Sequence, residues 1–154
     1  MVVFVPASRE ALSGLTATPL TGPVAAFGVT PGLCDTFSLP PSADEEAERT
    51  ALLLAGLASL IAYGSRLVVV VETAATDDGG GLGECTLPGV AWRDVSAIFA
   101  EPTDAKAAVA AAAAAVHGLD LDAAWDTTPV QNLLRAVPEQ VVLGHEEVDA
   151  LVGA

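Results

Sequence analysis

The sequence predicts a single layered α/β domain, with a sheet of four or five strands that is at least partly parallel and covered by helices. Its length of 154 residues suits one domain with its own core. Hydrophobic residues make up 52% of the chain, which argues against disorder. Short apolar runs alternate with helix starts, which is the pattern of strand-and-helix units in a layered fold.

The first unit lies at the N-terminus. Residues 2–5 (VVFV) form an apolar, mostly β-branched run that is typical of a buried strand. We expect Pro6 to end this strand, because proline cannot donate a hydrogen bond to a strand ladder. Ser8 then suits the N-cap of a short helix over Arg9–Leu15.

A second unit and the strongest strand follow. A strand over residues 24–29 leads into Thr30 and Pro31, a cap and a first-turn proline that begin a short helix. Residues 67–71 contain four consecutive valines, which predicts a central strand buried on both faces. Residues 73–87 are rich in glycine and aspartate and are expected to form a mobile loop.

A long helix is predicted between these two units. Ser42 begins a capping-box pattern (SADE), and an apolar run follows as far as Tyr63, with Gly64 as the stop. Helical spacing places large residues on one side and small residues on the other. We expect the large side to pack on the sheet, whereas the small side either admits another helix or forms an alanine-covered surface. The large side holds Leu53, Leu57, Leu60 and Ile61, and the small side holds Ala51, Ala55, Ala58, Ser59 and Ala62.

The C-terminal part continues the alternation. Alanine has the highest helix propensity, so the alanine-rich stretch is a secure helix. The expected elements are a strand over Val95–Ala100, a helix over Lys106–Val116, a connector over residues 120–125, a helix over 128–137, a strand over 140–143 and a helix over 145–152.

Candidate binding residues follow the strands. If the strands are parallel, the breaks between strand and helix meet at one edge of the sheet, where α/β proteins usually bind ligands. This edge would collect the candidates Ser8, Arg9, Thr30, Glu72 (with Thr73 beside it), Glu101, Thr103 and His145.

No catalytic residue is predicted. The chain has no G-x-S-x-G elbow. Ser8 and His145 could meet in a triad with Asp35 or Glu101, but a capping serine and a helix-start histidine explain both residues. Glu72 and Glu101 each follow an apolar strand, so they are either an acid/base pair or structural caps.

No metal or cofactor is predicted either. Cys34 and Cys85 are expected to be reduced and structural, and with His117 and His145 they show none of the spacings of a zinc site. The glycine-rich loop over residues 77–84 is bracketed by carboxylates, which would repel a phosphate.

The charge is strongly one-sided. Twenty acidic residues against six basic ones give a net charge of -14, which argues against nucleic acid and anionic membranes as partners. The longest apolar segment, over residues 51–63, is too short to span a bilayer, and the N-terminus lacks a basic n-region. We therefore expect a cytoplasmic protein.

The order of several segments resembles a known family. VFVPAS, GPVAAFGVTPGL, DEEAERTALLLAGLASL, RLVVVVET, WRDVSAIFAEPTDAKAAVAAA and VVLGHEEVDAL follow one another as in the DUF6912 family of small uncharacterised actinobacterial proteins. This resemblance implies a fold and a taxonomic setting but no activity. The family's last strand usually ends in a Trp-Tyr pair, for which Leu143 and Gly144 stand here.

Three functional hypotheses remain. The first is a noncatalytic interaction or regulatory domain with a protein partner, or a homodimer through the small-residue helix side. The second is a small-molecule binder or enzyme with its site at the proposed sheet edge. The third is an acidic binder of a basic protein surface, for which the acids should gather on one face. The scarcity of reactive side chains favours the first.

Overall fold

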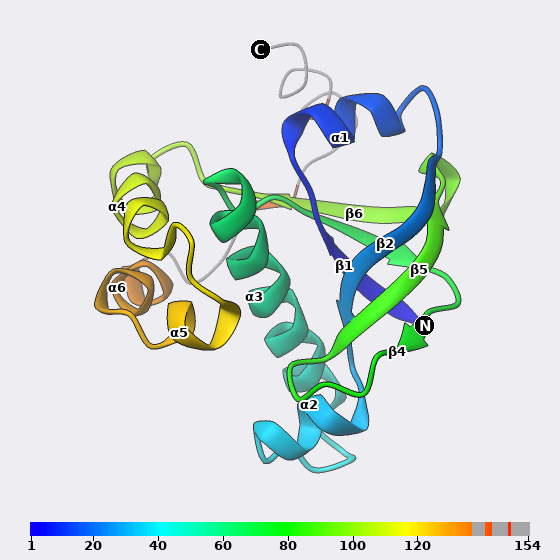
Figure 1. Cartoon of the computed structure of the whole chain (residues 1–154), viewed down its shortest axis with the longest axis horizontal. Helices are drawn as coiled ribbons and strands as arrows, with labels where there is room; N and C mark the ends of the chain where they lie inside the picture. Colours follow the sequence, from blue (N-terminus) through cyan, green and yellow to red (C-terminus); the bar gives the residue numbers. More distant parts are fainter. Residues whose placement is uncertain (137–140, 143–147, 149–154) are drawn as a thin grey trace.

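The computed structural model describes residues 1–136, 141–142 and 148. Within these residues, seven strands form one sheet in the order β4-β5-β2-β1-β3-β6-β7. Figure 1 shows the sheet with α1 and α3 packed beside it. The strands are β1 (Val2–Pro6), β2 (Leu20–Gly28), β3 (Val68–Glu72), β4 (Thr76–Asp77), β5 (Glu84–Val90), β6 (Val95–Ala100) and β7 (Val141–Val142).

Every pair of neighbouring strands is antiparallel. The prediction of a four- to five-stranded, at least partly parallel sheet is therefore wrong. The physical reason is the strand order. β2 and β3 run in the same direction, but they are not neighbours, because β1 lies between them and runs opposite to both. The connection from β2 to β3 thus crosses over a central antiparallel strand. The helix α1 (Arg9–Leu15) packs through Leu12 and Leu15 on the face of the sheet and leads into β2, which is antiparallel to β1.

The central strand β1 is paired unequally on its two sides. It pairs with β3 over five positions, from Val2↔Glu72 to Pro6↔Val68, but with β2 only at Val3↔Gly28 and Phe4↔Phe27. Successive residues of a strand direct their backbone groups alternately to the two neighbours. Because the Ala7 N–H donates to the Leu67 carbonyl on the β3 side, Pro6 is directed towards β2.

Pro6 consequently ends one ladder and not the other. It has no N–H to donate to β2, so the β1–β2 ladder stops after Phe4. On the β3 side Pro6 needs no N–H, and β1 continues through it. The prediction that Pro6 ends the strand is correct only for the β2 side.

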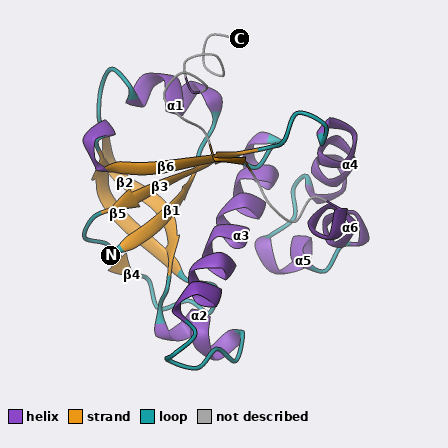
Figure 2. Cartoon of the chain, turned by 180° about the vertical axis from the view of Figure 1, so that it is seen from behind, coloured by secondary structure: helices purple, strands orange, loops and turns teal. Residues whose placement is uncertain are grey.

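The helix α3 (Asp44–Tyr63) lies along one face of the sheet, between the sheet and the C-terminal helices (Figure 2). Its small residues Ala51 and Ala55 are fully buried against the sheet. They form one cluster with Phe4 of β1, Phe27 of β2, and Val68 and Val70 of β3. Its large residues Leu57 and Leu60 pack against the other helices. The predicted orientation is therefore reversed, because the alanines let α3 approach the phenylalanines of the sheet closely, and Leu54 packs in the same cluster.

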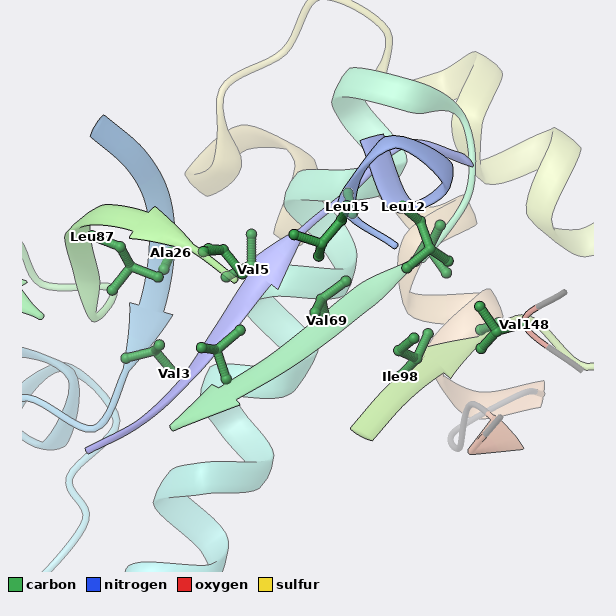
Figure 3. Close-up of a cluster of buried hydrophobic side chains, with 14 of the residues drawn as sticks. Val3, Val5, Leu12, Leu15, Ala26, Val69, Leu87, Ile98 and Val148 are labelled. Carbon is green, nitrogen blue, oxygen red and sulfur yellow. The ribbon is translucent and has the colours of Figure 1, made fainter. Parts of the chain in front are cut away.

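The opposite face of the sheet carries the main core. The outer surface of this core is closed by α1 and by Val148 (Figure 3). Its most deeply buried members include Val3, Val5, Leu12, Leu15, Val69, Leu87, Ile98 and Val148.

Three helices form a third layer behind α3: α4 (Lys106–Val116), α5 (Leu121–Trp125) and α6 (Thr128–Ala136). The predicted connector over residues 120–125 is in fact α5, because the Asp120 carboxylate caps it by accepting from the Ala123 N–H at 2.8 Å. A further short helix, α2 (Pro31–Thr36), precedes α3, and a 3-10 turn, η1 (Trp92–Asp94), precedes β6.

Two other predictions are corrected, and a third lies outside the described residues. The N-cap of α3 is Ala43 without a side-chain hydrogen bond, so Ser42 forms no capping box. The predicted loop over residues 73–87 contains β4 and the first half of β5, since Cys85 and Leu87 bury on the core side. The predicted helix over residues 145–152, apart from Val148, lies outside the described residues, as do Leu143 and Gly144.

The close contact of α3 with the sheet makes a testable prediction. Ala55→Leu adds three carbons where Ala55 is fully buried, so we expect a loss of about 1–3 kcal/mol in the free energy of unfolding. Urea denaturation measures this loss. Ala114→Leu, at an exposed position of α4, is the control and should stay within about 0.5 kcal/mol of the parent. Equal stability of the two variants would contradict the packing described above.

Candidate functional site

The antiparallel sheet divides the predicted site residues between two edges. β1 and β6 end where β3 begins, whereas β2 and β3 end at the opposite edge. The prediction that all the breaks share one edge is therefore wrong. Ser8, Arg9, Glu101 and Thr103 lie at the first edge, Thr30 and Glu72 with Thr73 lie at the second, and His145 lies outside the described residues.

Two of the candidates are helix caps. The Ser8 hydroxyl accepts from the Ala11 N–H at 3.0 Å, and the Thr30 hydroxyl accepts from the Leu33 N–H at 3.2 Å. Thr30 is also buried, so its hydroxyl faces α2 and is hidden from solvent. These two residues position α1 and α2, and the sequence interpretation of both as caps is confirmed.

Glu72 and Glu101 do not form an acid/base pair. Glu72 ends β3, while Glu101 contacts Arg66, which precedes the start of β3. The length of β3 keeps the two carboxylates roughly 15–20 Å apart. A structural role for Glu101 is instead visible in its contacts with Arg66.

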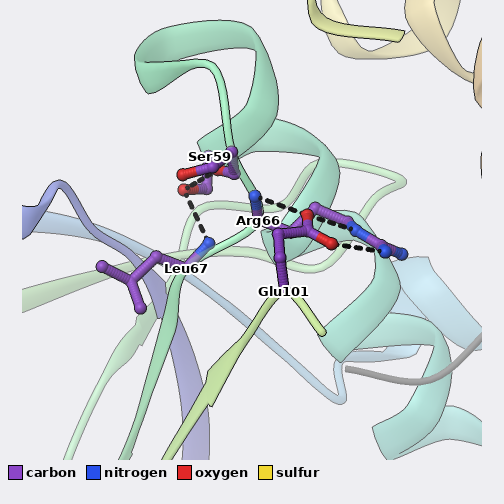
Figure 4. Close-up of polar contacts among 5 residues, drawn as sticks. Ser59, Arg66, Leu67 and Glu101 are labelled. Atoms are coloured by element: carbon purple, nitrogen blue, oxygen red, sulfur yellow. Dashed lines mark hydrogen bonds and ion pairs between the residues drawn. The ribbon is translucent and has the colours of Figure 1, made fainter. Parts of the chain in front are cut away.

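Arg66 and Glu101 form a two-pronged ion pair (Figure 4). The Arg66 Nε donates to Glu101 Oε1 at 2.8 Å, and Nη2 donates to Oε2 at 2.7 Å. The backbone N–H of Arg66 also donates to Oε1 at 2.9 Å. The side chain of Arg66 is only 3% exposed and that of Glu101 is 15% exposed. This pair ties the turn between α3 and β3 to the end of β6.

Ser59 supports the same turn from α3 (Figure 4). Its hydroxyl accepts from the Leu67 N–H at 3.2 Å and lies 2.8 Å from the Ser65 carbonyl and 3.2 Å from the Ala7 carbonyl. Ser59 is fully buried, and its hydroxyl lies within hydrogen-bonding distance of backbone groups of the turn and of Ala7, the residue after β1. These contacts link the backbone around Arg66 to α3 and to the residue after β1.

A pocket of about 350 Å³ opens beside the ion pair. It lies between the start of α1, the turn after α3, the end of β6 and the start of α4, and three predicted candidates line it. We call it the cationic pocket. Its described lining residues are Arg9, Gly64, Ser65, Arg66, Leu67, Ala100, Glu101, Pro102, Thr103, Lys106, Val109 and Ala110.

The charge of this pocket is opposite to that of the chain. Three of the six basic residues of the sequence, Arg9, Arg66 and Lys106, are among its described lining residues, and Glu101 is the one carboxylate among them. The described lining thus carries a net charge of +2, in a chain of net charge -14. Glu101 is held by Arg66, which leaves the exposed Arg9 and Lys106 to set the local potential.

The pocket combines this charge with an apolar floor. Leu67, Ala100 and Val109 are buried members of the lining. The first turn of α4 also begins here, and its N-cap Ala105 has no side chain to satisfy the free N–H groups. Such a site can accept an anionic group at its rim and an apolar body at its floor.

Sequence reasoning missed Arg66 and Lys106. One signal for Arg66 was present: it lies in the short turn between the Gly64 stop and the buried, valine-rich strand. For Lys106 no such signal exists, since a lysine at the start of an alanine-rich helix is ordinary.

The environment of Cys85 disfavours a reactive thiol. Burial, and then the nearby charges of Asp77, Asp78 and Glu84, raise the pKa of the Cys85 thiol, which disfavours the reactive thiolate. Within the described part of the chain, no group of three or more His, Cys, Asp or Glu side chains is placed to hold a metal ion. Within that part, too, every helix is too short or too polar to cross a bilayer.

Comparison with known proteins gives one match. The model of a family of unknown function, DUF6912, matches residues 1–134. No curated protein and no solved structure matches the chain. The matched region includes β1 to β6 and every described residue of the cationic pocket. The chain therefore belongs to the DUF6912 family.

Proposed function

We propose that this protein is a small-molecule binding domain whose ligand carries an anionic group and an apolar body, held in the cationic pocket. The observation that carries the proposal is the gathering of half of the basic residues of a strongly acidic chain around one apolar pocket. Its volume lies within the range of small-molecule sites.

Each part of the pocket has a separate task in this proposal. Arg9 and Lys106, both exposed at the rim, attract and hold the anionic group. The Arg66–Glu101 pair fixes the wall between them, and the buried floor takes the apolar body. Because the ion pair and Ser59 hold the wall in place, little ordering is required when the ligand binds.

The structure weakens the case for a homodimer formed through α3. The small-residue side of α3 was the feature that favoured a homodimer, and Ala51, Ala55 and Ser59 on that side are fully buried within the chain itself. A role for these residues in contacting a partner would require α3 to leave the sheet. A binding pocket is therefore better supported than an interaction surface.

The proposal is tested with 8-anilinonaphthalene-1-sulfonate, a probe with an anionic sulfonate and an apolar ring system. We expect saturable binding that weakens with added salt. Arg9→Glu and Lys106→Glu should each raise the Kd about tenfold, because each removes one charge-assisted contact and adds a repulsive charge. Titration followed by fluorescence measures the Kd.

The matched control is Arg93→Glu, which makes the same change in net charge on η1, where the Arg93 side chain is 88% exposed and distant from the described pocket lining. It should leave the Kd within about twofold of the parent. If Arg93→Glu weakens binding as strongly as Arg9→Glu, the effect comes from net charge alone and the proposed site is wrong. Unchanged binding in all three variants would also contradict it.

A further inference from the structure

A second pocket lies where the sheet opens beside Pro6. The β1–β2 ladder ends at Phe4↔Phe27, and beyond this point β2 diverges from β1 while remaining paired with β5 as far as Leu20↔Val90. The opening contains a cavity of about 540 Å³. We call it the sheet-opening pocket. It is larger than the cationic pocket, and the two pockets share none of their described lining residues.

The lining of this pocket comes from both faces of the sheet. Val5, Leu12 and Val69 belong to the core beneath α1, whereas Phe27 belongs to the cluster beneath α3. The pocket therefore enters the gap between the two strands and is more than a groove on one surface. Its other described lining residues are Pro6, Ala7, Ala11, Leu15, Leu20, Thr21, Pro23, Val24, Ala25, Ala58, Ala62, Tyr63 and Val90.

None of these described lining residues is charged, although the chain has 26 charged side chains. Thr21 and Tyr63 provide the polar side chains. Tyr63 is 54% exposed, which is unusual for so large a side chain, and it stands at the solvent side of the pocket. An anionic or cationic ligand would lose its hydration here without a countercharge in return.

Backbone groups supply the remaining polarity. The Gly28 N–H donates to Gly83 of the hairpin, so alternate residues of β2 direct their backbone groups to the other side. Ala25 is one of these, and it is directed into the gap opposite Pro6. The gap thus offers backbone donors and acceptors within an otherwise apolar lining.

We infer that the sheet-opening pocket binds an uncharged, largely apolar small molecule that has at least one hydrogen-bonding group. The size of the cavity, its apolar lining and the absence of charge among its described lining residues select this class. The ring of Tyr63 stacks on the ligand at the mouth, and the backbone of Ala25 orients it. Pro6, which lacks the N–H that would close the ladder, keeps the opening available.

The probe for this site is N-phenyl-1-naphthylamine, which is neutral, apolar and carries one N–H. We expect its fluorescence to rise on saturable binding to the full chain. The double variant Ala11→Leu/Ala62→Leu places larger side chains from α1 and α3 into the pocket, and binding should fall at least fivefold. Ala107→Leu/Ala114→Leu makes the same change at exposed positions of α4 and should bind as the parent does.

A second variant tests the site independently of whether the Ala11→Leu/Ala62→Leu protein folds. Tyr63→Ser changes an exposed side chain and should weaken binding of the neutral probe about threefold. The inference is overturned if the parent chain does not bind the probe, or if both the filled and the Tyr63→Ser variants bind it as the parent does. Arg9→Glu and Lys106→Glu should not affect this probe, so failure here and failure of the cationic pocket are distinguishable.

Discussion

Glu101→Ala is expected to lower the free energy of unfolding by about 3–5 kcal/mol, because it leaves the buried guanidinium of Arg66 without its carboxylate. The carboxylate accepts two hydrogen bonds from the Arg66 side chain and one from its backbone. Removing it therefore also leaves a backbone N–H of the turn without this acceptor. Urea denaturation followed by circular dichroism measures the loss.

The control for this prediction is Asp104→Ala, which removes an exposed carboxylate three residues further along the chain. It should change the stability by less than about 0.5 kcal/mol. The double variant Arg66→Met/Glu101→Leu removes both charges and should recover a large part of the loss. A loss below about 1 kcal/mol for Glu101→Ala would show that the pair is not a structural link between β6 and the α3–β3 turn.

Gly83→Ala is expected to destabilise the protein by about 2–4 kcal/mol. Gly83 has a φ of +79°, and a Cβ added there would lie 2.5 Å from the backbone carbonyl oxygen of Gly28. The left-handed conformation alone costs an alanine about 1 kcal/mol. The clash adds about 1–3 kcal/mol, because Gly28 is paired with Val3 of β1 and its carbonyl cannot move freely.

Gly79 separates the two contributions. It lies in the same hairpin with a φ of +80°, but a Cβ added there would meet nothing within 4 Å. Gly79→Ala should therefore cost only the conformational part, about 1 kcal/mol, when both variants are compared by thermal or urea unfolding. Equal losses for Gly79→Ala and Gly83→Ala would contradict the close approach of the hairpin to β2.

Local sequence patterns predicted many elements well but not their pairing. The predicted bounds of α1, α4 and β6 agree with the structure, because caps, alanine propensity and proline stops act within a few residues. Whether two strands pair in parallel depends on which strands become neighbours. The four valines of β3 do not predict this, because such an apolar run is compatible with both parallel and antiparallel sheets. The strand β5 was missed because Pro88 and Gly89 interrupt its apolar alternation.

The candidate site could be predicted only in part. Arg9, Glu101 and Thr103 do line one pocket, because β1 and β6 end at the same edge. The grouping with Thr30 and Glu72 failed, since β2 and β3 end at the other edge. The partnership of Arg66 and Glu101 spans 35 positions and has no local signal.

The central position of β1 has a consequence for how the chain folds. The strand β1 pairs with residues as far along the chain as Glu72, and the ladder of β2 with β5 is similarly distant in sequence. At a synthesis rate of about 5–20 residues per second, β1 waits roughly 4–14 s for its β3 partner. This high contact order predicts slow folding, in milliseconds to seconds, and it leaves the β3-facing edge of β1 unpaired long after its β2 partner has been synthesised.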